Sequence, residues 1–183
     1  MPPQPSAAAV TSGPDPFALL DLPARYDLEL ATIEARFREK SRALHPDRFA
    51  GAPAAERARA LVAARALNDA YQVVRRPQRR AEALLARAGL TIGDHERLDP
   101  EFLTEILELR EELAEARLAG RVDEVGRLAA AMAARRRALE DGLTARFAAG
   151  DAAALELARR DLITLRYVMR YLEECDAALD ERE

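Results

Sequence analysis

Residues 42–51 read RALHPDRFAG, and this stretch separates two segments of helical periodicity. Pro46 has no backbone N–H and disfavours helical backbone at the residue before it, so a helix that reaches this point ends at His45. Apolar or small residues precede the tripeptide His45-Pro46-Asp47 at helical spacing, at Leu30, Ile33, Phe37, Ser41 and Leu44. Others follow it, at Ala60, Ala64, Leu67, Tyr71 and Val74. The pattern predicts antiparallel helices over residues 28–44 and 54–75, joined by an exposed His45-Pro46-Asp47 loop.

The composition is typical of packed helices. Of 183 residues, 49% are hydrophobic, 33% are charged and 5% are aromatic. Ala, Leu, Arg and Glu dominate, which favours helices over sheets, and we therefore predict an all-α protein. The net charge of −4 hides an uneven layout, with basic residues crowded into residues 36–80 and acidic ones into 101–115. This layout favours two different protein partners over nucleic acid.

The sequence gives no support for a metal site, a cofactor site or a membrane-spanning segment. Cys175 is the single cysteine, and the two histidines, His45 and His95, lie far apart, so we expect no metal site and no cofactor. A single cysteine also favours a reducing compartment, and we expect a cytoplasmic protein. No stretch approaches about 18 consecutive apolar residues, so no membrane-spanning helix is expected. Residues 1–14 lack the pattern of a targeting signal and are expected to form a disordered tail.

The chain is predicted to hold two domains and a connecting segment. We expect residues 15–80 to contain a short helix at 17–22 and the helical hairpin. Residues 81–98 are expected to hold the rest of a short helix that begins at Pro77 and ends at Gly89, followed by a linker where the apolar period lapses from residue 89. Three long apolar stripes with short turns between them predict an antiparallel three-helix bundle over residues 99–183.

An enzymatic role for the His-Pro-Asp tripeptide has little support. Ser41 lies one turn before His45, so a hydrolytic grouping with Asp47 is conceivable. However, the chain shows no Gly-rich nucleophile turn and no evident oxyanion donors. We therefore expect no catalytic residues and no enzymatic activity.

Residues on both sides of the tripeptide form longer blocks. A basic amphipathic helix ends before HPDRF at 45–49, and the next helix carries LNDAY at 67–71. Together these blocks resemble the J-domain of DnaJ-type co-chaperones. Three further blocks resemble the HscB family of J-domain co-chaperones, which acts in iron-sulfur cluster assembly: LPARY at 22–26, RAEALL at 80–85 and FLTEILELREEL at 102–113. The zinc-binding cysteine extension of eukaryotic members is missing, which favours a bacterial form.

The resemblance implies that the first domain docks on a heat-shock-cognate chaperone. In this family the J-domain binds the ATPase domain of the chaperone, and the tripeptide is needed to stimulate ATP hydrolysis. The chaperone-binding residues that the resemblance implies are His45, Pro46, Asp47, Arg36, Arg38, Lys40, Arg42 and Arg48. Arg48 stands where many relatives have Lys, which keeps the positive charge but changes its shape.

Apolar residues outside the predicted core mark a second candidate surface. With the apolar stripe of the first bundle helix turned inward, the helical period leaves Leu107 facing outward and Leu103 beside it. On the last bundle helix, the same reasoning turns the row of Ile163, Tyr167 and Tyr171 away from the core. Such rows either pack against the first domain or bind a partner.

The resemblance favours a partner at this second surface. HscB-like proteins bind the iron-sulfur cluster scaffold protein through the bundle, at positions that match Leu103, Leu107, Glu108, Arg110, Glu111, Glu115 and Tyr167. The chain is therefore expected to stimulate the chaperone ATPase and to deliver the scaffold protein to it. Two alternatives stay open. A J-domain co-chaperone for another client would not bind the scaffold, and a helical structural or oligomerising protein with an accidental tripeptide would not change chaperone turnover.

Overall fold

The computed structural model describes residues 14–93, 96 and 98–180, and within these residues all regular structure is helical. The all-α fold class predicted from the sequence is confirmed. The expected tail, residues 1–14, lies outside the described residues except for Pro14, and His95 lies outside them too. The elements are α1 (Pro16–Leu19), α2 (Leu30–Ala43), η1 (Pro46–Phe49), α3 (Ala54–Val74), α4 (Pro77–Arg87), α5 (Pro100–Leu118), α6 (Val122–Ala149) and α7 (Ala152–Asp180).

The chain divides into two compact units between Thr91 and Ile92. The N-terminal unit contains α1 to α4, and the C-terminal unit contains α5 to α7. The sequence analysis assigns residues 81–98 to a connecting segment. In the structure, the first part of that segment belongs to α4, which packs on the N-terminal core through Ala83 and Leu84.

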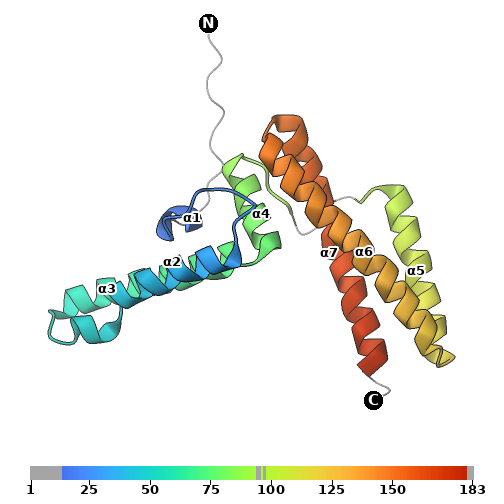
Figure 1. Ribbon diagram of the computed structural model, residues 1–183, viewed down its shortest axis with the longest axis horizontal. Helices are drawn as coiled ribbons and strands as arrows, with labels where there is room; N and C mark the ends of the chain where they lie inside the picture. Colours follow the sequence, from blue (N-terminus) through green and yellow to red (C-terminus); the bar gives the residue numbers. More distant parts are fainter. Residues whose placement is uncertain (1–13, 94–95, 97, 181–183) are drawn as a thin grey trace, which may run out of the picture. The chain divides into compact units, whose positions relative to one another are not determined.

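The N-terminal unit is built around the α2–α3 hairpin, whose helices run side by side (Figure 1). The rings of Phe37 on α2 and Tyr71 on α3 stack with their centroids 4.1 Å apart. Leu30 was expected in the core but is exposed. The backbone at Glu29 is extended, so Leu28 rather than Leu30 packs against the core where the chain enters α2. The main cluster of buried residues in this unit consists of Phe17, Leu20, Leu22, Ile33, Leu67, Ala70 and Val74.

A buried arginine closes the end of this hairpin that lies away from the His-Pro-Asp loop. Arg80 on α4 is only 5% exposed. Its Nε donates to the carbonyl of Val74 at 2.6 Å, and its Nη1 donates to the carbonyls of Tyr26 at 2.6 Å and Leu28 at 3.1 Å. Burial lowers the pKa of Arg80, but an arginine stays protonated in proteins, so the charge is retained and shared among three carbonyl oxygens.

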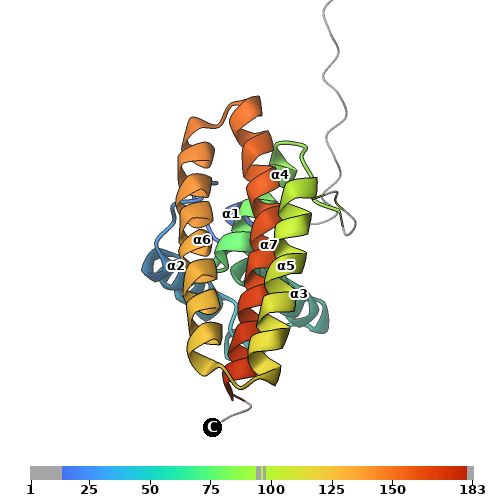
Figure 2. The ribbon, with the colours of Figure 1, turned by 90° about the vertical axis from the view of Figure 1, so that its right-hand side faces the viewer.

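The C-terminal unit is a three-helix bundle, in which α5, α6 and α7 lie side by side (Figure 2). Gly150 ends α6 with φ of 68°, a left-handed conformation that glycine adopts without strain, and its N–H donates to the carbonyl of Arg146. Burial raises the pKa of Cys175 to about 11, so its thiol stays protonated inside the bundle. One cluster of buried core residues consists of Phe102, Ile106, Leu113, Ala116, Val125, Leu128, Met132, Val168, Tyr171, Cys175 and Ala178.

The predicted outward row on the last helix is wrong at two of its three positions. Ile163 and Tyr171 are buried, and only Tyr167 is partly exposed. The reason is that α7 packs against both α5 and α6 and therefore buries a broader face than a single apolar stripe would indicate. The hydroxyl of Tyr171 donates to the carbonyl of Leu109 on α5 at 2.9 Å, which satisfies its one polar group within the bundle.

None of the helices in the described ranges is both long and apolar enough to cross a bilayer.

The three carbonyl contacts of Arg80 give a test of the N-terminal fold. Replacing Arg80 by Met should destabilise this unit by at least about 2 kcal/mol, because buried carbonyl oxygens lose their donors. Native-state hydrogen exchange read by mass spectrometry should then show faster exchange in α2 and α3, with unchanged exchange in the bundle helices. The control is Arg79→Met, because the side chain of Arg79 is exposed and its replacement leaves the contacts of Arg80 in place. Equal exchange in the two variants would contradict a structural role for Arg80.

Candidate functional site

The His-Pro-Asp tripeptide lies at the turn between α2 and α3. The last hydrogen bond of α2 is made by the N–H of Leu44, and the backbone of His45 is then extended, with φ of −62° and ψ of 135°. Pro46 begins the short 3-10 helix η1, a position where its missing N–H costs no hydrogen bond. The sequence analysis expected an irregular loop here. The structure has one ordered turn instead, which fixes the backbone of the tripeptide.

The side chains of the tripeptide are directed to solvent. The His45 side chain is 59% exposed and that of Asp47 is 89% exposed. The Nδ1 atom of His45 accepts the backbone N–H of Asp47 at 3.3 Å and lies 3.4 Å from the Asp47 carboxylate. An imidazole that accepts through Nδ1 carries its proton on Nε2, so the other ring nitrogen is the donor that His45 can offer. The site therefore presents a carboxylate and an N–H donor on a fixed turn.

Basic residues line α2, but acidic neighbours partly neutralise them. Arg36 pairs with Glu39 at 3.1 Å and Arg38 with Glu34 at 3.5 Å. Lys40 pairs with Asp21 at 2.8 Å. The i, i+3 and i, i+4 spacings of the first two pairs are visible in the sequence, and the analysis above did not use them. Exposed pairs of this kind are weak, and α2 still carries four basic and two acidic residues. Two further candidate residues, Arg42 and Arg48, are exposed.

The outer face of α5 carries the second candidate surface. Leu103 is 44% exposed and Leu107 is 52% exposed, as the helical period predicts. Ile106, next to Leu107 in the chain, is buried in the bundle core. Around the two leucines lie three exposed carboxylates, those of Glu108, Glu111 and Glu115. The helix therefore presents an apolar pair with an acidic border.

Two of the candidate residues also hold the bundle together. Arg110 on α5 pairs through Nη2 with Glu174 on α7 at 2.9 Å. The ring of Tyr167 meets the ring of Phe102 edge-on, with centroids 6.3 Å apart. Tyr167 thus links α7 to the helix that carries Leu103 and Leu107. The sequence shows the separate residues but not these contacts, since the partners of each pair are more than sixty positions apart.

Comparison with known proteins places both units in one family. The chain is 36% identical over 173 residues to a co-chaperone protein HscB homologue from Azoarcus sp. (strain BH72). The aligned region covers 92% of this chain and 96% of the relative. The chain belongs to the HscB family. Residues 98–176 match the family described as the HSCB C-terminal oligomerisation domain. This family consists of J-type co-chaperones of iron-sulfur cluster assembly, so the resemblance noted in the sequence is confirmed.

Two solved structures of HscB have the same fold. Chaperone HscB from Vibrio cholerae superposes with a TM-score of 0.79 at 29% identity, over 93% of this chain and 100% of that one. Human co-chaperone protein HscB superposes with a TM-score of 0.78 at 25% identity, over 96% of this chain and 83% of that one. The architecture of J-domain hairpin and helical bundle is therefore shared along nearly the whole chain.

Ile106 and Leu107 form a matched pair for testing the helical phase of α5, since the first is 1% exposed and the second 52%. Ile106→Ala should destabilise the bundle by about 2 to 5 kcal/mol through the cavity it leaves. Leu107→Ala should change the stability by less than about 1 kcal/mol, because about half of its side chain already lies in water. Thermal melts followed by circular dichroism compare the two variants. Similar losses in both would show that Leu107 packs in the core.

Proposed function

We propose that this HscB-family protein stimulates the ATPase of a heat-shock-cognate chaperone and delivers an iron-sulfur cluster scaffold protein to it. The observation that carries the proposal is the His-Pro-Asp tripeptide on an ordered turn, with the Asp47 side chain 89% exposed. The protein itself catalyses no reaction and works in the bacterial cytoplasm. The family membership and the J-domain hairpin support this role.

The tripeptide acts by recognition. The Asp47 carboxylate can accept two N–H donors from an arginine of the chaperone, a geometry that gives strong and directional pairing. Pro46 keeps the turn in one conformation, so little conformational entropy is lost when the chaperone binds. The basic residues of α2 favour encounter with an acidic surface on the chaperone, which speeds association more than it tightens binding.

The outer face of α5 acts as the client surface. Leu103 and Leu107 lose water contact when the scaffold protein covers them, which supplies the apolar part of the binding energy. Glu108, Glu111 and Glu115 border this apolar pair and select a partner with basic groups opposite them. Tyr167 extends the apolar area onto α7 through its contact with Phe102.

The role of Asp47 is tested by Asp47→Asn in a chaperone ATPase assay. We expect stimulation to fall to near the basal rate of the chaperone, because the amide removes the charge that pairs with an arginine. The melting temperature should stay unchanged, because the side chain is almost fully exposed. Asp69→Asn, at an exposed carboxylate on α3 of the same unit, is the control and should stimulate normally. Full stimulation by Asp47→Asn would refute the proposed role of the tripeptide.

The client surface is tested by the Leu103→Ala, Leu107→Ala double variant. Apolar anchors typically contribute about 1 to 3 kcal/mol each, so affinity for the scaffold protein should fall at least about thirtyfold in calorimetric titration. Stimulation of the chaperone without scaffold should persist, because it depends on the other unit. Leu118→Ala is the matched control, since Leu118 is an exposed leucine of the same helix. Unchanged scaffold binding by a folded double variant would place the client surface elsewhere.

A further inference from the structure

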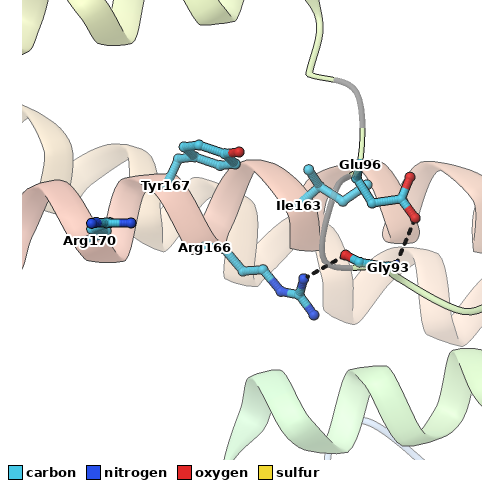
Figure 3. A pocket seen from close by; sticks show the side chains of 6 residues that line it. All are labelled: Gly93, Glu96, Ile163, Arg166, Tyr167 and Arg170. Carbon is cyan, nitrogen blue, oxygen red and sulfur yellow. Dashed lines mark hydrogen bonds between the residues drawn. The ribbon is translucent and has the colours of Figure 1, made fainter.

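A hollow of about 180 Å³ opens beside α7 within the C-terminal unit. Figure 3 shows Arg166 and Tyr167 leaving α7 on opposite sides, with Ile163 and Glu96 toward one end and Arg170 toward the other. The loop before α5 contributes Glu96 and also Gly93, whose carbonyl accepts a long hydrogen bond of 3.4 Å from Arg166. Two arginines and a tyrosine are thus among the residues that line the hollow.

Among the described residues that line the hollow, two are basic and one is acidic. The acidic one, Glu96, accepts the N–H of Gly93 at 2.8 Å and pairs with Arg159 at 2.5 Å. These contacts lower the pKa of Glu96, and the charges of Arg159 and Arg166 act in the same direction. From residue 162 to residue 172, α7 carries Arg166 and Arg170 and no acidic residue. The charge of these two arginines therefore dominates the opening.

Arg170 is placed to receive an acceptor from outside the chain. Its side chain is 74% exposed, and its Nε lies 3.7 Å from the Glu174 carboxylate, beyond hydrogen-bond distance. The same oxygen of Glu174 accepts a closer bond, at 2.9 Å, from Arg110. The guanidinium of Arg170 therefore retains donors for a partner.

The hollow continues the proposed client surface. Tyr167 forms part of its wall and also contacts Phe102, the residue before Leu103 on α5. The apolar strip of Leu103, Leu107 and Tyr167 thus has acidic residues on its α5 side, at Glu108 and its neighbours. On its α7 side it has the basic residues Arg166 and Arg170. The two borders carry opposite charge.

We propose that the hollow binds an acidic side chain of the same scaffold protein that docks on α5, so that this inference rests on the proposed function. Arginine guanidinium groups bind a carboxylate in a planar, two-bonded geometry, and the hydroxyl of Tyr167 offers a further donor. Glu108 lies on one border of the client surface and Arg170 on the other. A scaffold protein bound in the reverse orientation would therefore place its acidic groups near Glu108 and its basic groups near Arg170, where they are repelled. The hollow therefore fixes the orientation of the client as well as adding affinity.

The test is an Arg166→Glu, Arg170→Glu double variant, titrated calorimetrically with the scaffold protein encoded by the same genome. We expect affinity to fall at least about tenfold, because the reversed charges repel the carboxylate. Arg127→Glu, Arg137→Glu, at two exposed positions on α6, changes the net charge by the same amount and should bind like the wild type. Arg170→Glu alone changes an exposed side chain, so its weaker binding cannot be attributed to unfolding.

The outcomes separate this inference from the function on which it rests. If the wild-type protein does not bind the scaffold, the proposed function fails and the hollow has no client. If the wild type binds and the Arg166, Arg170 variant binds equally well, the client surface stands and the hollow is no part of it. If the α6 control loses as much affinity as the α7 variant, the effect comes from net charge, and the inference is overturned.

Discussion

The guanidinium of Arg80 is the interaction on which the N-terminal unit depends. A hairpin of two helices is covalently closed at one end only, and here Pro46 and the following turn close that end. Arg80 closes the other by joining the carbonyl at the end of α3 to those of Tyr26 and Leu28 before α2. With both ends held, α2 and α3 keep one register, and the tripeptide at their junction has a fixed backbone. The helices that flank the tripeptide are thus held together at the far end of the hairpin as well.

A related constraint applies to the bundle, because the proposed function requires one helix both to pack in the core and to bind a partner. On α5, Ile106 faces the core while Leu107, one residue later, lies largely in water. Since adjacent residues on a helix point about 100° apart, the two tasks fall to different faces and do not compete. Tyr167 is the point where they meet, because its ring both packs on Phe102 and remains partly exposed. A surface anchored in this way is rigid before a partner arrives, which reduces the entropy lost on binding.

The features that could be predicted from the sequence follow from local rules. Pro46 ends a helix through its own chemistry, and Leu107 is exposed because the helical period places it outside the stripe. Arg80 could not be predicted as buried, because arginine is rarely buried and two of its acceptors lie 52 and 54 positions earlier in the chain. Tyr171 was assigned to the surface because an apolar stripe does not reveal how many neighbours a helix has, and α7 has two in the bundle. The apolar periodicity therefore predicts the helices and one buried face of each. The polar contacts between residues far apart in the sequence are seen only in the structure.

The short connection between the units bears on how a client reaches the chaperone. Residues 88–99 join α4 to α5, and in their described part Glu96 pairs with Arg159 on α7. A short tether between two binding surfaces raises the effective concentration of one partner near the other to the order of millimolar. If each surface binds as proposed, a scaffold protein on the bundle is thereby held near a chaperone on the tripeptide. Covalent linkage can therefore supply delivery, and each surface needs only to be specific for its own partner.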